Sequence, residues 1–215
     1  MKIIGYDKKE IKTINVINNS DSIAVLYPGR GYFLNAAVFD YLGYLLTDMK
    51  IDILGIDTRY SENSEINFLP IDKQKEWFYY DSVAIGNEIK HELEKYKRKI
   101  FIGKSLGTAH IRKNISDGII TEDSLLVWLT PAFEIIDFYE YVKTLKFKSL
   151  IIYGTKDHYY SEKSMGKIIN TDNITVLELP ETGHSFEVDS NVDQSIENIK
   201  IVINAIKDFI TEGNN

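Results

Sequence analysis

From residue 99 to residue 107 the chain reads Lys-Ile-Phe-Ile-Gly-Lys-Ser-Leu-Gly. The apolar run predicts a buried strand that ends at Ile102, and the amphipathic residues 106–114 predict a helix directly after it. A serine on a tight turn between a strand and a helix adopts strained backbone angles, so the residues two before and two after it must be small. Gly103 and Gly107 meet that need, and Ser105 is therefore a candidate nucleophile.

The same residues admit two other interpretations. Serine is favoured at helix N-caps, so Ser105 can be an ordinary cap. The run Gly103-Lys104-Ser105 also matches the end of a phosphate-binding P-loop, but that motif needs a glycine at position 98, where this chain has Arg98. The P-loop interpretation fails, and the N-cap stays open as the alternative.

Around this turn, short runs rich in Ile, Val and Leu alternate with longer amphipathic stretches, which is typical of a mostly parallel sheet with connecting helices. Strands are predicted at 11–17, 23–27, 51–56, 99–102, 125–129, 150–153 and 174–179, with residues 2–6 as an antiparallel partner of the first. Helices are predicted at 34–47, 74–96, 106–114, 132–144, 161–169 and 193–211, and a polar loop at 58–72. The expected fold is an α/β three-layer sandwich with helices on both faces of the sheet.

Composition narrows the classes of function. A chain of 215 residues, 44% of them hydrophobic, is expected to bury one core as a single domain over residues 1–215. The net charge of -7 gives no overall positive field for nucleic acid or anionic lipid. The absence of cysteine excludes disulfides, thiolate zinc sites and a cysteine nucleophile. Because no signal peptide and no apolar span of about 18 residues is evident, we expect a soluble, cytoplasmic protein with no membrane partner.

A serine nucleophile needs a base, and four histidines are available. His91 lies in mid-helix among glutamates, His110 one turn into the helix after the serine, and His158 directly after an aspartate. His184 lies in a turn between the last predicted strand and the last predicted helix, and the loops at strand carboxyl ends are where α/β sheets assemble their sites. We predict that His184 is the general base, with a capping or surface histidine as the alternative.

The acid that orients the base is predicted to be Asp157, which directly follows the strand at 150–153. The alternative for Asp157 is a turn or capping aspartate, which is common after glycine. Asp57 and Asp137 compete for the role. Asp57 precedes the serine in the sequence, and Asp137 falls within a predicted helix, so Asp157 is preferred.

The backbone N–H groups of Arg30 and Leu106 are predicted to form an oxyanion hole. Arg30 follows the strand at 23–27 between two glycines, which let N–H groups turn toward a ligand, although a plain tight turn is the alternative. Leu106 lies at a helix N-terminus, where negative charge is stabilised. Arg59, Tyr32 and Tyr159 are candidate substrate contacts. For the two arginine side chains, a solvated loop position is the alternative to binding a carboxylate or phosphate.

Together these residues resemble the α/β-hydrolase superfamily, and the resemblance covers nearly the whole chain. The order serine, acid and histidine at 105, 157 and 184 is the order of the family. The run 28–31, Pro-Gly-Arg-Gly, looks like the oxyanion loop of the family, with Tyr27-Pro28 where a histidine is usual. The run 57–59, Asp-Thr-Arg, resembles a loop that in many members continues with glycines, which this chain lacks there.

The resemblance implies a serine hydrolase that acts on a carboxylic ester or thioester through an acyl-enzyme, with a small-molecule substrate, no metal and no organic cofactor. Members with a lid insert it between the strands read here at 125–129 and 150–153, where only about 20 residues lie, enough for one helix. A site without a lid, open or covered only by residues 58–72, is expected. The same fold also hosts acyltransferases and lyases, and a non-catalytic small-ligand binder is a further alternative. The substrate itself and the oligomeric state are not predicted.

Overall fold

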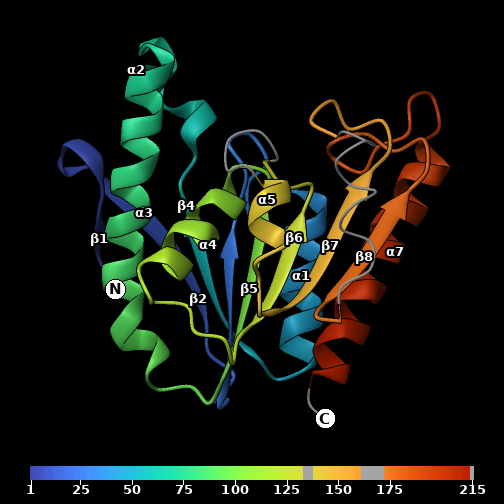
Figure 1. The fold of residues 1–215 in the computed structure, drawn as a ribbon, viewed down its shortest axis with the longest axis horizontal. Coiled ribbons are helices and arrows are strands. Elements are labelled where there is room, and N and C mark those ends of the chain that lie inside the picture. Colours follow the sequence, from blue (N-terminus) through green and yellow to red (C-terminus); the bar gives the residue numbers. More distant parts are fainter. Residues whose placement is uncertain (133–137, 161–171, 214–215) are drawn as a thin grey trace.

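The computed structural model describes residues 1–132, 138–160 and 172–213. Their centre is one sheet with the strand order β1-β2-β4-β3-β5-β6-β7-β8 (Figure 1). The parallel strands are β3 (Ser22–Tyr27), β4 (Asp52–Asp57), β5 (Arg98–Lys104), β6 (Leu125–Leu129), β7 (Lys148–Gly154) and β8 (Ile174–Leu179). At one edge, β2 (Glu10–Val16) runs antiparallel to β4, and β1 (Ile3–Ile4) antiparallel to β2. The predicted edge hairpin is therefore present.

Helices cover both faces of the sheet (Figure 1). On one face lie α1 (Ala37–Asp48) and α7 (Val192–Glu212), and on the other α3 (Ile71–Leu93), α4 (Gly107–Ser116) and α5 (Phe138–Val142). Successive side chains of a strand point to opposite faces, so Phe101 of β5 packs with α4 while Ile100 and Ile102 pack with α1 and α7. Burial on both faces explains why the strands are continuous apolar runs. The predicted three-layer α/β fold is confirmed.

The segment predicted as a polar loop at 58–72 is more regular than expected. It contains the 3-10 helix η2 (Tyr60–Glu62) and the short helix α2 (Ser64–Phe68), and α3 begins within it. The side chain of Asn63 accepts hydrogen bonds from the backbone N–H groups of Glu65 and Ile66 at 3.0 and 3.4 Å. A helix as short as α2 is stabilised by its cap and by one buried residue, Ile66. Because it has a single buried residue, it shows no apolar periodicity from which it could be predicted.

Two further predictions concern helices next to undescribed residues. The predicted helix 161–169 lies outside the described residues, as do residues 133–137 of the predicted helix 132–144. In the described part of the helix predicted at 132–144, the structure has α5 and the turn after it. Near the start of the chain, the 3-10 helix η1 (Tyr6–Lys8) joins β1 to β2.

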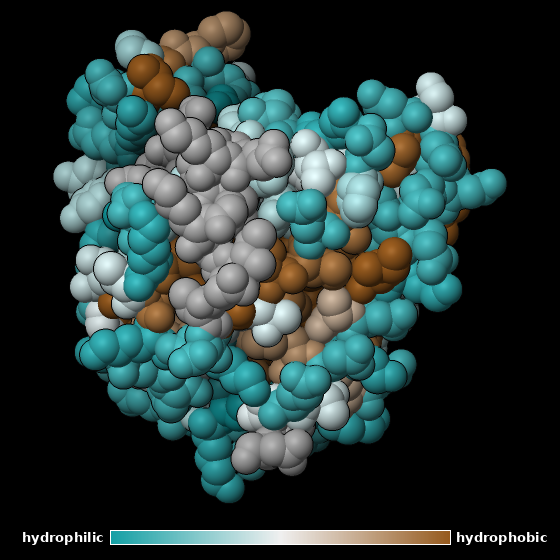
Figure 2. All heavy atoms as spheres, turned by 45° about the vertical axis from the view of Figure 1, so that its right-hand side comes forward, coloured by the Kyte–Doolittle hydropathy of each residue, from teal (hydrophilic) through white to brown (hydrophobic). Residues whose placement is uncertain are grey.

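The β8 side of the molecule carries hydrophobic side chains in the middle of its surface, with hydrophilic ones around them (Figure 2). Within β8, Val176 and Leu177 are only half-buried, as befits a strand at the edge of the sheet. Among the described residues, no helix combines the length and the apolar character needed to cross a membrane. The long helices α3 and α7 instead bury one face against the sheet.

The carboxyl ends of β3, β5, β7 and β8 lie at the same end of the sheet (Figure 1). The loops that follow these strands carry the residues singled out in the sequence. Parallel strands therefore gather those residues at one edge of the molecule.

Candidate active site

Ser105 lies on the turn between β5 and α4 with a φ of 50°. This left-handed conformation is costly for any residue other than glycine and is found where surrounding structure enforces it. The backbone N–H of Ser105 is fixed by a 2.9 Å hydrogen bond to the carbonyl of Leu129. The N-cap of α4 is Leu106, and no side chain caps this helix. Ser105 is therefore not the ordinary helix cap that was its alternative.

The two glycines that flank this turn allow close backbone packing. A Cβ on Gly107 would lie 2.0 Å from the carbonyl oxygen of Tyr27, and a Cβ on Gly103 would lie 2.8 Å from the side chain of Ile111. Real Cβ atoms do not approach other atoms so closely, so any larger residue would displace α4 from β3 and β5. The spacing of the motif thus reflects the packing of α4 against the sheet.

His184 and Asp157 are brought together from two different loops. His184 follows β8 and Asp157 follows β7, and Nδ1 of His184 lies 2.8 Å from Oδ2 of Asp157. The other carboxylate oxygen, Oδ1, accepts the backbone N–H of Tyr159 at 3.0 Å. A Cβ on Gly154 would lie 2.0 Å from the carbonyl of Thr182, so the two loops can meet only because Gly154 has no side chain. The histidine is therefore held in one orientation by a buried carboxylate.

The electrostatics of this pair favour an ionised acid and a neutral base. Burial raises the pKa of Asp157, but the hydrogen bonds from His184 and from the N–H of Tyr159, together with the charges of His184 and Lys104, outweigh burial and leave the pKa below its ordinary value. Burial lowers the pKa of His184, and the hydrogen bond to Asp157 offsets this only in part. An ionised Asp157 accepts the proton on Nδ1, which leaves Nε2 free to accept another proton.

Ser105 and His184 line one hollow of about 270 Å³, together with Arg30, Tyr32, His158 and Tyr159. A second, mainly apolar hollow of about 150 Å³ also reaches Ser105, and its wall includes Arg30, Ile71, Phe78, Ala132 and Tyr159. Ser105 thus lies where an apolar hollow meets a polar one. This arrangement can hold an apolar group beside the serine while the histidine faces it from the other side.

Solved structures resemble this arrangement of strands and helices, although no protein-family model and no curated protein matches the chain. Est1E from Butyrivibrio proteoclasticus is similar with a TM-score of 0.72 and 13% identity over 99% of this chain and 98% of that one. The esterase Pf2001 of Pyrococcus furiosus is similar with a TM-score of 0.68 and 14% identity over 99% of this chain and 89% of that one. A serine hydrolase homologue from Coxiella burnetii gives 0.64 and 14% over 96% of each chain. The chain has the α/β-hydrolase fold.

In this α/β-hydrolase fold, the loop after β3 passes directly beside Ser105. A Cβ on Gly29 would lie 3.2 Å from the Cβ of Ser105. The N–H of Gly29 bonds to the carbonyl of Tyr32, which closes the loop into a turn. The backbone N–H groups of Arg30 and Leu106 make no hydrogen bond with any described residue. Their role as an oxyanion hole stays a prediction.

Lys104 is a functional candidate that the sequence analysis did not assign. Its side chain is fully buried, and Nζ donates to the carbonyl of His184 at 2.7 Å and to Oγ1 of Thr130 at 2.8 Å. The ammonium also lies over the rings of Tyr32 and Phe186 at 4.6 and 5.4 Å. Burial lowers its pKa to about 7, although Asp157 and Glu187 favour the charged form. Its place beside Ser105 in the motif was the one signal in the sequence.

The three predicted substrate contacts have different surroundings. Tyr159 lines both hollows, and Tyr32 lines the polar one, where its hydroxyl accepts the backbone N–H of Val38 at 3.1 Å. Arg59 lines neither hollow. Its guanidinium pairs with Asp57 at 2.8 Å and with Glu62 at 3.1 Å. Asp57, a competitor for the acid, therefore binds an arginine, and the other competitor, Asp137, lies outside the described residues.

The remaining histidines are placed less favourably for a base. His110 is buried, with Nδ1 2.7 Å from the hydroxyl of Ser82, and burial lowers its pKa to about 4. The side chain of His91 is 83% exposed. His158 lines the polar hollow, but its Nδ1 is 4.0 Å from Asp157, against 2.8 Å for His184. His184 has the carboxylate partner.

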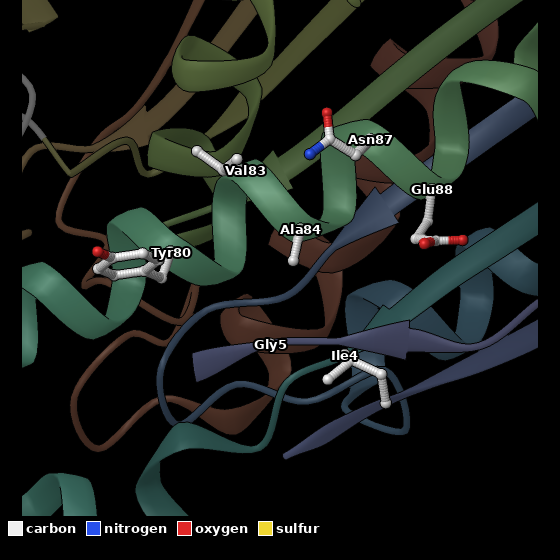
Figure 3. A pocket seen from close by; sticks show the side chains of 7 residues that line it. All are labelled: Ile4, Gly5, Tyr80, Val83, Ala84, Asn87 and Glu88. Carbon is white, nitrogen blue, oxygen red and sulfur yellow. The ribbon is translucent and has the colours of Figure 1, made fainter. Parts of the chain in front are cut away.

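A separate hollow of about 270 Å³ lies between β1 and α3, where Ala84 and Glu88 point from the helix toward Ile4 (Figure 3). Among its lining residues only Tyr80 and Glu88 are titratable, and they include no pair of nucleophile and base. Within the described part of the chain, no three His, Asp or Glu side chains gather as a metal site would require. The hollow at Ser105 is therefore the candidate active site.

Proposed function

We propose that this chain is a serine hydrolase of the carboxylesterase or thioesterase type, with Ser105 as nucleophile, His184 as general base and Asp157 as the orienting acid. The observation that carries the proposal is the 2.8 Å pairing of His184 with the buried Asp157 in a hollow that also contains the strained Ser105. A nucleophile, a base and a group that orients the base are the parts that covalent acyl transfer needs.

In the first half of the reaction, Nε2 of His184 takes the proton of the Ser105 hydroxyl while Oγ bonds to the acyl carbon. The carbonyl π pair moves to the oxygen, and the N–H groups of Arg30 and Leu106 stabilise the negative charge that develops there. When the intermediate collapses, the protonated histidine gives its proton to the departing alcohol or thiol. An acyl-enzyme on Ser105 remains.

In the second half, water takes the place of the alcohol. His184 accepts a proton from water as the oxygen attacks the acyl carbon, and the same donors hold the oxyanion. The Ser105 oxygen then leaves and regains a proton from His184, which releases the carboxylic acid. Asp157 remains ionised throughout and stabilises the imidazolium in each half.

The proposal includes a single domain over residues 1–215 without an inserted lid, acting in the cytoplasm on a small soluble substrate. The small size of the substrate is supported by the wall of the apolar hollow, to which α3 contributes Ile71 and Phe78. Ile71 is exposed at the start of the helix, so this wall is open to solvent at one side. A small acyl group fits such a hollow better than a long chain.

The test is labelling with a fluorophosphonate, followed by mass spectrometry of the modified peptide. One adduct is expected, on Ser105, and Ser105→Ala should abolish it. Ser185, exposed in the same hollow, offers a matched control, because Ser185→Ala should leave the adduct in place. A folded protein with no adduct, or with an adduct on another serine, would contradict the assignment and favour a non-catalytic binder.

A further inference from the structure

Two arginines lie near the candidate site, and their partners differ in charge. The guanidinium of Arg59 is neutralised by Asp57 and Glu62. Among the described residues, the guanidinium of Arg30 bonds to neutral groups, with Nη1 3.0 Å from Oε1 of Gln74 and Nη2 2.6 Å from Oδ1 of Asn67. Within the described part of the chain, Arg30 forms no ion pair, so no described carboxylate neutralises its positive charge.

The two amides fix the position of this guanidinium. The amide nitrogen of Gln74 donates to the carbonyl of Leu69 at 2.8 Å, and that of Asn67 donates to the carbonyl of Ser61 at 2.9 Å. Each amide therefore presents its oxygen to Arg30. Gln74 is also buried, which restricts its motion. An arginine held by fixed neutral acceptors is oriented before any ligand arrives, which lowers the entropic cost of binding.

Arg30 has unused N–H donors and is part of the candidate site. A guanidinium has five N–H donors, and the described residues use two of them. Arg30 lines both hollows that contain Ser105. Lys75, which also forms no ion pair with a described residue, lines the apolar hollow beside it. Two cations without an ion pair to any described residue at one hollow, in a chain with a net charge of -7, give a local positive potential that favours an anionic ligand.

We infer that the side chain of Arg30 binds a carboxylate on the substrate, so that the preferred substrate is an ester or thioester whose acyl part carries a second, ionised carboxyl group. This inference rests on the proposed function and specifies its substrate class. One guanidinium matches one carboxylate in charge, and its planar donors match the two oxygens. The scissile carbonyl then lies at Ser105 and the free carboxylate at Arg30.

The experiment compares two esters of equal length that differ in charge, monoethyl succinate and ethyl butyrate. The wild-type protein is expected to have a higher kcat/KM for the succinate ester. Arg30→Gln keeps the backbone N–H but removes the charge, and should reduce the ratio of the two kcat/KM values about tenfold or more, as for a lost charge-assisted hydrogen bond. Arg59→Gln is the matched control, because it removes a neutralised guanidinium, and should leave this ratio unchanged.

If Arg30→Gln leaves the ratio of the two kcat/KM values unchanged, the inference is overturned. This includes the case in which both values fall equally, because that pattern belongs to a structural role of Arg30 in the loop. A second measurement does not depend on catalysis. Monoethyl succinate should bind to Ser105→Ala, and about tenfold more weakly to the double variant with Arg30→Gln, by calorimetry. If the wild-type protein hydrolyses neither ester but binds monoethyl succinate in a way that depends on Arg30, the proposed hydrolase is overturned and the carboxylate site is kept. If it hydrolyses both esters without preference, the hydrolase is kept and the carboxylate site is overturned.

Discussion

The ammonium of Lys104 donates a 2.7 Å hydrogen bond to the backbone carbonyl of His184, so the residue before the proposed nucleophile holds the loop of the proposed base. A second hydrogen bond joins Lys104 to Thr130 at the end of β6. Three loops are thereby tied together by one buried charge.

Replacement of Lys104 by methionine is expected to shift the pH profile of hydrolysis. The nearby ammonium lowers the pKa of His184, in addition to the effect of burial. Without it, the pKa of His184 rises, and the acid limb of kcat/KM moves to higher pH because the base must be neutral to accept a proton. The measurement is kcat/KM for a soluble ester from pH 4 to 9.

Lys99 provides the control for this shift. It lies at the opposite end of the same strand, with Asp123 as its surface partner at 3.5 Å. Lys99→Met should leave the acid limb where it is. An acid limb that Lys104→Met also leaves in place would show that Lys104 has only a structural role.

The same lysine predicts how stability depends on pH. Burial lowers the pKa of Lys104 in the folded protein to about 7, against 10.5 for a free lysine. Between these values the unfolded chain binds a proton that the folded chain does not, so the free energy of unfolding rises with pH. The penalty of the buried charge is complete below about pH 7 and is relieved as the pH rises toward 10.5. The contribution is at most about 1.4 kcal/mol for each pH unit.

Urea denaturation at pH 6, 7.5 and 9 tests this dependence. The stability of the wild-type protein relative to Lys104→Met should be constant below pH 7 and should increase above it. Parallel pH dependences for the two proteins would contradict the lowered pKa.

The catalytic roles of Ser105 and His184 predict that their effects are not additive. Because the two side chains act in one proton transfer, Ser105→Ala, His184→Ala and the double variant should lose activity to a similar extent. Asp157→Asn should cost about 10³- to 10⁴-fold in kcat, since an amide favours the wrong tautomer of the histidine. Asp57→Asn is the control, because Asp57 binds Arg59 and should have a much smaller effect. Steady-state kinetics of the five variants decide the assignment.

The wild-type pH profile follows from the same pair. The pKa of His184 lies below the ordinary histidine value of 6.5, with burial as the largest cause. The rate should therefore rise with pH through an apparent pKa below 6.5 and reach its plateau near neutrality. A midpoint above pH 7 would contradict a neutral, desolvated His184.

Local patterns predicted the elements that carry this site. The turn at Ser105 depends on glycines within two residues of it, and Asp157 and His184 each follow a short apolar strand, so their positions at strand ends could be read from the sequence. The hydrogen-bond partners of Lys104 and Arg30 could not be predicted from the sequence. Lys104 meets Thr130 and His184, and Arg30 meets amides of α2 and α3, through contacts that exist only after the sheet has formed.

The two arginines illustrate the same limit. Arg59 is neutralised by residues two before and three after it, a local signal that the sequence analysis did not use. For Arg30, one neutral partner, Gln74, begins the helix predicted at 74–96, and the other, Asn67, comes from the segment interpreted as a polar loop, where capping by Asn63 makes a short helix. Without the position of that helix, the two arginines could not be distinguished.

The last prediction concerns acyl length. The apolar hollow at Ser105 has a volume of about 150 Å³ and is open at one side, so it should hold an acyl chain of only a few carbons. Within that length, each added methylene leaves water and gains about 0.8 kcal/mol, or roughly fourfold in kcat/KM. Beyond it, further methylenes stay in solvent and the gain should stop. Ethyl esters from acetate to octanoate, assayed below and above their solubility limits, test this. A preference that keeps growing toward octanoate, with a jump in rate at the solubility limit, would mean that residues 58–72 cover the site as a lid does, because only a closed wall removes a long chain from water.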